Sequence, residues 1–141
     1  LLASSAASDV YKRQIMKYSK QREHILKTLR ENVIHPTADE IYALARKGMP
    51  SLSLATVYRN LNQLAENGII RRIDGLDGSV HFDHNLCKHY HFICTKCNKV
   101  YDVAYDIAPD LADKVLAETG LFVESFDISL KGICPNCKKN N

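Results

Sequence analysis

Two Cys-x-x-Cys pairs constrain this chain more than any other feature of its sequence. The pairs are Cys94/Cys97 and Cys134/Cys137, and the 36 residues 98–133 separate them. A structural zinc ion takes four ligands at tetrahedral corners, and each Cys-x-x-Cys turn supplies two thiolates from one tight turn. The spacing therefore predicts one closed zinc site with four cysteine ligands.

Two other uses of cysteine fit this pattern less well. A thioredoxin-type redox pair comes singly and opens a helix in a βαβ unit, whereas Cys94 follows an apolar, strand-like run. A disulfide framework is typical of small secreted domains, while 141 residues are enough to build a hydrophobic core. Cys87 lies outside both pairs, and we expect it to be a linker thiol.

Charge divides the chain into two parts. Residues 16–73 have a net charge of +5 and residues 74–141 a net charge of −3, within an overall charge of +3. A basic first part and an acidic second part suggest two modules with different partners, nucleic acid being the natural partner of the basic one. No apolar run approaches the length of a transmembrane helix, so we expect no membrane association.

The first fifteen residues do not carry the basic and apolar regions of a secretory signal. Helical periodicity begins directly after Met16. We therefore expect Met16 to be the natural start, residues 1–15 to be a non-native or disordered leader, and the protein to be cytoplasmic.

Hydrophobic periodicity predicts three helices in the basic part. The first spans Ser19–Asn32. The second begins with a capping box, in which Thr37 and Glu40 satisfy each other's backbone donors. The third begins after Ser53, and its apolar positions recur at i, i+4 and i+7.

A β-hairpin is predicted after the third helix, with segments 69–73 and 79–82 on either side of a glycine-containing turn. Three helices and a hairpin form a winged helix-turn-helix, which places its third helix in the major groove of DNA. On that helix Arg59 is suited to guanine, Asn62 to adenine and Tyr58 to a thymine methyl. Phosphate contacts are expected from Lys20, Arg22, Arg71 and Arg72. The alternative is that Tyr58 is a core residue and Arg59 an ordinary surface charge.

The segments Ala38–Tyr42, Ser53–Leu61 and His89–Cys97, together with the two Cys-x-x-Cys pairs, resemble the ferric uptake regulator family of bacterial metal-dependent repressors. The resemblance extends from about Met16 to Lys139. It is most specific in the stretch Ala-Thr-Val-Tyr-Arg-Asn-Leu and in the cysteine pairs.

The resemblance implies an α+β protein, with an N-terminal winged helix-turn-helix DNA-binding domain and a small C-terminal α/β dimerisation domain. We place the DNA-binding domain at residues 16–83, a hinge at 84–88 and the metal-binding dimerisation domain at 89–141. The second domain is expected to contain strands near 89–94, 100–105 and 122–131 and a helix near 109–119. The family also implies a homodimer that binds double-stranded DNA at an AT-rich inverted repeat.

A second metal site is expected apart from the cysteines. Side chains alternate along the strand that begins at His89, so His89 and His91 face one side and Cys94 the other. The family resemblance implies regulatory ligands at His35, Asp83, His89, His91 and Asp102. Three imidazoles and two carboxylates suit Fe²⁺, Mn²⁺ or Zn²⁺. His24, His81 and His84 are not assigned to any site.

The aspartate at position 102 makes the chain resemble the peroxide-sensing branch of the family, because iron sensors more often have glutamate at this position. In that branch, Fe²⁺ at the regulatory site reacts with hydrogen peroxide, and a ligand histidine is oxidised, here His35 or His89. We therefore expect a peroxide-responsive repressor with structural Zn²⁺ and regulatory Fe²⁺ or Mn²⁺, and no small-molecule substrate other than peroxide. An iron-responsive or zinc-responsive regulator of the same family is the alternative.

Two other classes of protein fit the sequence less well. A zinc hydrolase keeps an open coordination position for water, whereas four thiolates close the site, and the sequence has no His-Glu-x-x-His motif, so we expect no enzyme. A zinc-stabilised interaction module would leave Tyr58, Arg59 and the basic first part without a function.

Overall fold

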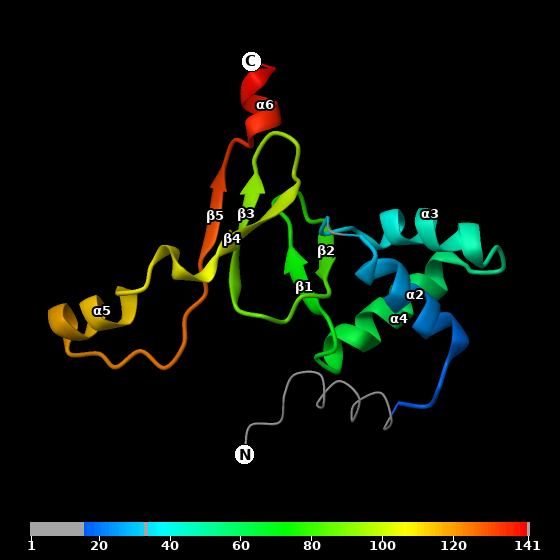
Figure 1. Ribbon diagram of the computed structural model, residues 1–141, viewed down its shortest axis with the longest axis horizontal. Coiled ribbons are helices and arrows are strands. Elements are labelled where there is room, and N and C mark those ends of the chain that lie inside the picture. Colours follow the sequence, from blue (N-terminus) through cyan, green and yellow to red (C-terminus); the bar gives the residue numbers. More distant parts are fainter. Residues whose placement is uncertain (1–15, 33, 141) are drawn as a thin grey trace. The chain divides into compact units, whose positions relative to one another are not determined.

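The computed structural model describes residues 16–32 and 34–140, and these residues fall into two compact units that divide between Leu86 and Cys87 (Figure 1). The boundary lies inside the segment predicted as a hinge. The predicted leader, residues 1–15, lies outside the described residues. None of the described helices is long and apolar enough to cross a membrane.

Three helices form the first unit, and a side chain caps the start of each. They are α2 (Lys20–Arg30), α3 (Ala38–Gly48) and α4 (Leu54–Glu66). The predicted capping box is present, because the Thr37 N–H donates to Glu40 at 2.9 Å and the Glu40 N–H donates to Thr37 Oγ1 at 3.3 Å. Ser53 caps α4, and Gly68 follows it with φ of 69°, a left-handed conformation typical of the residue after a helix.

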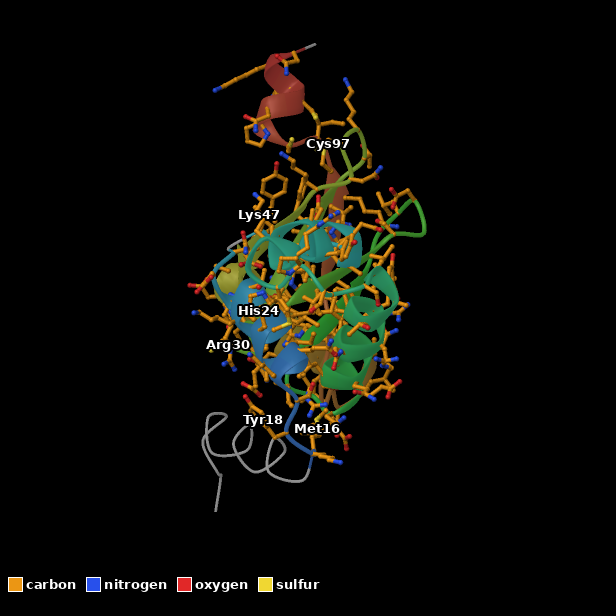
Figure 2. The ribbon with its side chains drawn as sticks, turned by 90° about the vertical axis from the view of Figure 1, so that its right-hand side faces the viewer. Met16, Tyr18, His24, Arg30, Lys47 and Cys97 are labelled. Atoms are coloured by element: carbon orange, nitrogen blue, oxygen red, sulfur yellow. The ribbon has the colours of Figure 1, made fainter. Side chains whose placement is uncertain are left out.

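The core of this unit forms where the apolar faces of the three helices meet. Its members are fully or almost fully buried and include Ile25, Leu29, Ile41, Val57 and Leu61. Met16, labelled in Figure 2, packs against the same core. The apolar stripes read from the sequence are therefore the buried faces.

A two-stranded antiparallel hairpin completes the first unit. Its strands are β1 (Arg71–Asp74) and β2 (Val80–Asp83), and Phe82 of β2 is buried in the helical core. An isolated bridge pairs Thr37 with His81, which attaches the start of α3 to the hairpin. The predicted winged helix-turn-helix architecture is thereby confirmed.

The second unit contains a three-stranded sheet of mixed direction in the order β4-β3-β5. The central strand β3 (His89–Cys94) pairs antiparallel with β4 (Val100–Ala104) and parallel with β5 (Ser129–Gly132). A short 3₁₀ helix, η1 (Tyr105–Ile107), leads to α5 (Leu111–Thr119), and α6 (Pro135–Lys139) ends the described chain. The predicted α+β class is confirmed.

Two details of the second unit differ from expectation. The strand expected over residues 122–131 forms only over Ser129–Gly132. The residues before it have no strand partner among the described residues, and Phe122 is 80% exposed. The apolar face expected on α5 exists in the sequence, but no residue of α5 is buried, and Leu116 is 44% exposed.

Candidate metal centres and nucleic-acid interface

The four paired cysteines meet at one point of the second unit. Their Sγ atoms all lie within 4.8 Å of one another, and those of Cys97 and Cys134 are 3.9 Å apart. A tetrahedral zinc ion with Zn–S bonds of about 2.3 Å implies sulfur–sulfur distances of about 3.8 Å. The four thiols therefore fit a closed zinc site.

The local fold explains how two distant pairs come together. Parallel pairing of β3 with β5 aligns Cys94 with Gly132, two residues before Cys134. The β3–β4 turn, where Figure 2 labels Cys97, is closed by a bond from the Asn98 N–H to the Cys94 carbonyl at 2.9 Å. Asn98 is left-handed with φ of 60°, which asparagine tolerates better than most residues. Cys134 caps the start of α6.

The environment of the thiols favours thiolate at two positions. A hydrogen bond from the Cys134 N–H, 3.4 Å from the sulfur, lowers the pKa of Cys94 to about 6. The pKa of Cys134 is lowered first by a hydrogen bond from the Tyr101 hydroxyl. The pKa of Cys137 is raised to about 12, first by its side-chain hydrogen bond with Cys134 and then by burial. Metal binding needs deprotonated thiols, and a coordinated divalent ion favours that form.

Tyr101 is a residue of this site that sequence reasoning missed. Its own pKa is raised to about 12, chiefly by the hydrogen bond to Cys134. Tyr101 pairs with Phe92, two residues before Cys94, so both tyrosine and thiol project from the same face of the sheet. The alternation of side chains along each strand places Tyr101 on the cysteine face only once the register of β3 and β4 is known.

Two of the predicted regulatory ligands lie together in the first unit. The Nε2 atom of His35 and the Oδ2 atom of Asp83 are 3.2 Å apart, and both side chains are less than a tenth exposed. His35 precedes α3 and Asp83 ends β2. A buried pair of nitrogen and carboxylate oxygen has the chemistry of a transition-metal ligand pair.

The other three predicted ligands lie together in the second unit. His91 is paired directly with Asp102 across β3 and β4, and His89 is two residues away on the same face. The Oδ1 atom of Asp102 is 3.1 Å from His89 Nε2 and 3.8 Å from His91 Nε2. The His89 Nδ1 atom lies 2.6 Å from the Cys87 carbonyl oxygen, which orients the ring with Nε2 towards the carboxylate.

The predicted DNA contacts are surface residues of the first unit. Tyr58 on α4 is 41% exposed, and Arg59 is exposed beside it. The residues Asn62, Arg71 and Arg72 share a recess of about 510 Å³ between the end of α4 and β1. Lys20 is exposed at the start of α2, while Arg22 is half-buried and its guanidinium donates to the Lys17 carbonyl.

Two further residues near these sites were not found from the sequence. Asp39 accepts a hydrogen bond from the Tyr58 hydroxyl at 3.1 Å, and this bond is the first cause of the raised pKa of Tyr58. His81, unassigned in the sequence, is buried, and its Nδ1 atom is 2.7 Å from the His35 carbonyl oxygen. The sequence does contain a signal for His81: it lies two residues before Asp83 in the same strand, and side chains two apart face the same side.

Curated relatives resemble the chain over most of its length. The chain is 33% identical over 133 residues to the peroxide operon regulator of Bacillus subtilis, covering 94% of this chain and 92% of the relative. It is 35% identical over 119 residues to the peroxide-responsive repressor PerR of Staphylococcus epidermidis, covering 84% and 79% respectively.

Solved structures agree with the fold. The ferric uptake regulator Fur of Helicobacter pylori, described as having three functional metal binding sites, matches with a TM-score of 0.79 and 25% identity, over 92% of this chain and 87% of that one. The Campylobacter jejuni peroxide stress regulator matches with a TM-score of 0.69 and 32% identity, over 91% and 96%.

The model of the ferric uptake regulator family matches residues 13–131, which is most of the chain. The chain therefore belongs to the ferric uptake regulator family, and it is a transcription regulator, not an enzyme.

Proposed function

We propose that this protein is a metal-dependent DNA-binding repressor that senses hydrogen peroxide through oxidation of a ligand histidine. The observation that carries the proposal is the same in both units: a histidine nitrogen faces a carboxylate oxygen, in His35/Asp83 and in His89/Asp102. The names of the curated relatives, a peroxide operon regulator and a peroxide-responsive repressor, support the choice of signal.

The regulatory site is proposed to take ligands from both units. His35 and Asp83 would come from the DNA-binding unit, and His89, His91 and Asp102 from the other. An ion held by both groups fixes the DNA-binding unit on its partner domain. Near-complete switching requires that the ion bind this arrangement about 10⁴-fold better than any other.

The three nitrogens and two carboxylates suit Fe²⁺ or Mn²⁺ at the regulatory site, whereas the four thiols suit Zn²⁺. Separate donor sets allow the two kinds of ion to be bound independently. The zinc is proposed to be structural, because four thiolates leave no position for a reacting group.

A homodimer is proposed to present two copies of α4 to the two halves of an AT-rich inverted repeat. The segment from η1 to residue 122 supports this proposal, because it exposes apolar side chains that include Ile107 (57%), Leu121 (64%) and Phe122 (80%). The outer edge of β5 pairs with no other strand among the described residues. Exposed apolar surface beside an open sheet edge is typical of an interface.

Peroxide sensing is proposed to act on His35 or His89. Bound Fe²⁺ supplies the one-electron chemistry with hydrogen peroxide. In the balanced reaction, one peroxide oxygen is added to the imidazole ring and the other leaves as water. The modified ring is a poorer ligand, so the two units lose their shared attachment and DNA is released.

The test is mass spectrometry of Fe²⁺-loaded protein before and after dilute peroxide, with DNA binding measured on the same samples. We expect one added oxygen on His35 or His89 and a parallel loss of binding. Protein loaded with Mn²⁺ is the control and should keep both its mass and its DNA affinity.

An iron-responsive or zinc-responsive regulator is the second candidate function. The same donor sets favour it, and one of the solved relatives is named a ferric uptake regulator. A chelator should release DNA under both functions, so the histidines decide between them. Unmodified histidines after peroxide, with iron-dependent DNA binding preserved, would replace the peroxide proposal.

A further inference from the structure

His81 is a buried histidine that none of the proposed sites uses. It lies in β2, is 7% exposed, and its Nδ1 atom is 2.7 Å from the carbonyl oxygen of His35. A carbonyl oxygen only accepts hydrogen bonds, so Nδ1 carries the proton in this contact. The ring of His81 therefore donates a hydrogen bond to the backbone of His35, a candidate metal ligand.

Three consecutive residues of β2 contact the segment 35–36. His81 donates to the His35 carbonyl, the Phe82 N–H donates to the Pro36 carbonyl at 2.9 Å, and the Asp83 carboxylate is 3.2 Å from His35 Nε2. His81 and Asp83 project from one face of the strand because side chains alternate. His81 is hydrogen-bonded to the backbone of His35, and the Asp83 carboxylate faces the His35 ring.

We propose that His81 is a positioning residue for His35, acting through the hydrogen bond from His81 Nδ1 to the His35 carbonyl oxygen. This inference rests on the proposed function, in which His35 is a regulatory ligand. A ligand must be held within roughly 0.5 Å of its productive position. Loss of a partner that orients a metal ligand typically reduces metal affinity about 10- to 100-fold.

The opposite edge of the His81 ring provides an internal control. Its Nε2 atom lies 3.1 Å from Ser79 Oγ, and the Ser79 N–H donates to Asp77 at 3.0 Å in the turn of the hairpin. Ser79→Ala removes the contact at Nε2 and leaves the contact at Nδ1. The two edges of the ring can therefore be tested separately.

The experiment compares His81→Asn, His81→Gln and His81→Leu in the full-length, zinc-loaded protein. The amide nitrogen of asparagine lies close to the position of histidine Nδ1, whereas that of glutamine lies close to Nε2. Affinity for Mn²⁺ is measured from the electron paramagnetic resonance signal of the unbound ion. We expect His81→Leu and His81→Gln to bind Mn²⁺ about 10- to 100-fold more weakly. His81→Asn and Ser79→Ala should stay within about threefold of the wild type, well short of that loss.

Amide hydrogen exchange in the metal-free protein provides a second readout, which does not depend on metal binding. The Phe82 amide, bonded to Pro36, should exchange faster in His81→Leu and His81→Gln and should stay protected in His81→Asn. Zinc content and circular dichroism verify that each variant folds. If His81→Leu does not fold, the pair His81→Asn and His81→Gln decides.

Two results would overturn the inference: Mn²⁺ affinity and Phe82 protection that are unchanged in His81→Gln, or an equal loss in His81→Asn and His81→Gln. A wild-type protein that binds no Mn²⁺ counts against the proposed function instead. In that case the exchange of the Phe82 amide still decides whether His81 holds the segment.

Discussion

The hydroxyl of Tyr58 donates a hydrogen bond to the carboxylate of Asp39 at 3.1 Å, and so joins α4 to the first turn of α3. The ring of Tyr58 remains 41% exposed, so the bond fixes an aromatic side chain on the surface. A fixed ring loses less conformational entropy when it contacts DNA.

Tyr58→Phe should therefore weaken binding to the specific site by about 0.5–1.5 kcal/mol, the usual net value of one hydrogen bond, while Tyr58→Ala should cost more. The phenylalanine variant keeps the ring and the net charge, so it isolates the bond. Fluorescence anisotropy with operator DNA measures both. If the phenylalanine variant bound as the wild type does, the bond to Asp39 would have no role in recognition.

Arg59 and Lys20 are both exposed cations of the first unit. Substituting each in turn distinguishes base recognition from phosphate contact. Arg59→Ala should reduce the preference for specific over random DNA by about 1–3 kcal/mol. Lys20→Ala should weaken all sequences alike and reduce the slope of log affinity against log salt by about 1. Salt titrations on both kinds of DNA provide the measurement, and equal effects of the two substitutions would remove Arg59 from base readout.

Cys94 is fully buried at the thiol cluster, whereas Cys87 is exposed and outside it. Cys94→Ser should lose the bound zinc and the folded structure of the second unit, since the free energy of metal binding is part of the free energy of folding at such sites. Cys87→Ser is the matched control and should retain one zinc per chain. Elemental analysis and thermal unfolding measure these outcomes. Full zinc retention in Cys94→Ser would contradict the assignment.

The Tyr101 hydroxyl donates a hydrogen bond to the sulfur of Cys134 and favours its thiolate form. Tyr101→Phe should release zinc to a competing chelator faster than the wild type, because the sulfur loses a hydrogen bond that favours its charged form. Phe92→Leu changes the side chain opposite Tyr101 in the sheet without touching the hydroxyl and serves as the control. Equal release rates in Tyr101→Phe and the wild type would show that the hydroxyl does not protect the site.

Phe122 is the most exposed large apolar side chain of the second unit. If this region forms the dimer interface, Phe122→Asp should shift the protein to monomer and weaken operator binding, with zinc content unchanged. Sedimentation velocity measures the assembly state. Glu124→Lys, an exposed substitution two residues away, distinguishes a specific apolar contact from a general effect of charge.

Local signals predicted the first unit well. The apolar stripes, the capping box at Thr37 and Glu40, and the glycine after α4 each act within a few residues, and such interactions are readable in sequence. The sequence predicts a strand over the segment 122–128 as well, but the strand forms only from Ser129, because strand propensity depends on neighbouring strands and this segment has no strand partner among the described residues.

The sequence by itself determined the spacing of the four cysteines and the position of the three helices, and it supplied the candidate metal ligands. Only the tertiary structure decided three hydrogen bonds, those of Tyr101 with Cys134, of Tyr58 with Asp39, and of His81 with the backbone of His35. The reason is physical. These contacts join residues far apart in the chain, and strand register and helix packing set them, whereas composition and periodicity constrain only near neighbours.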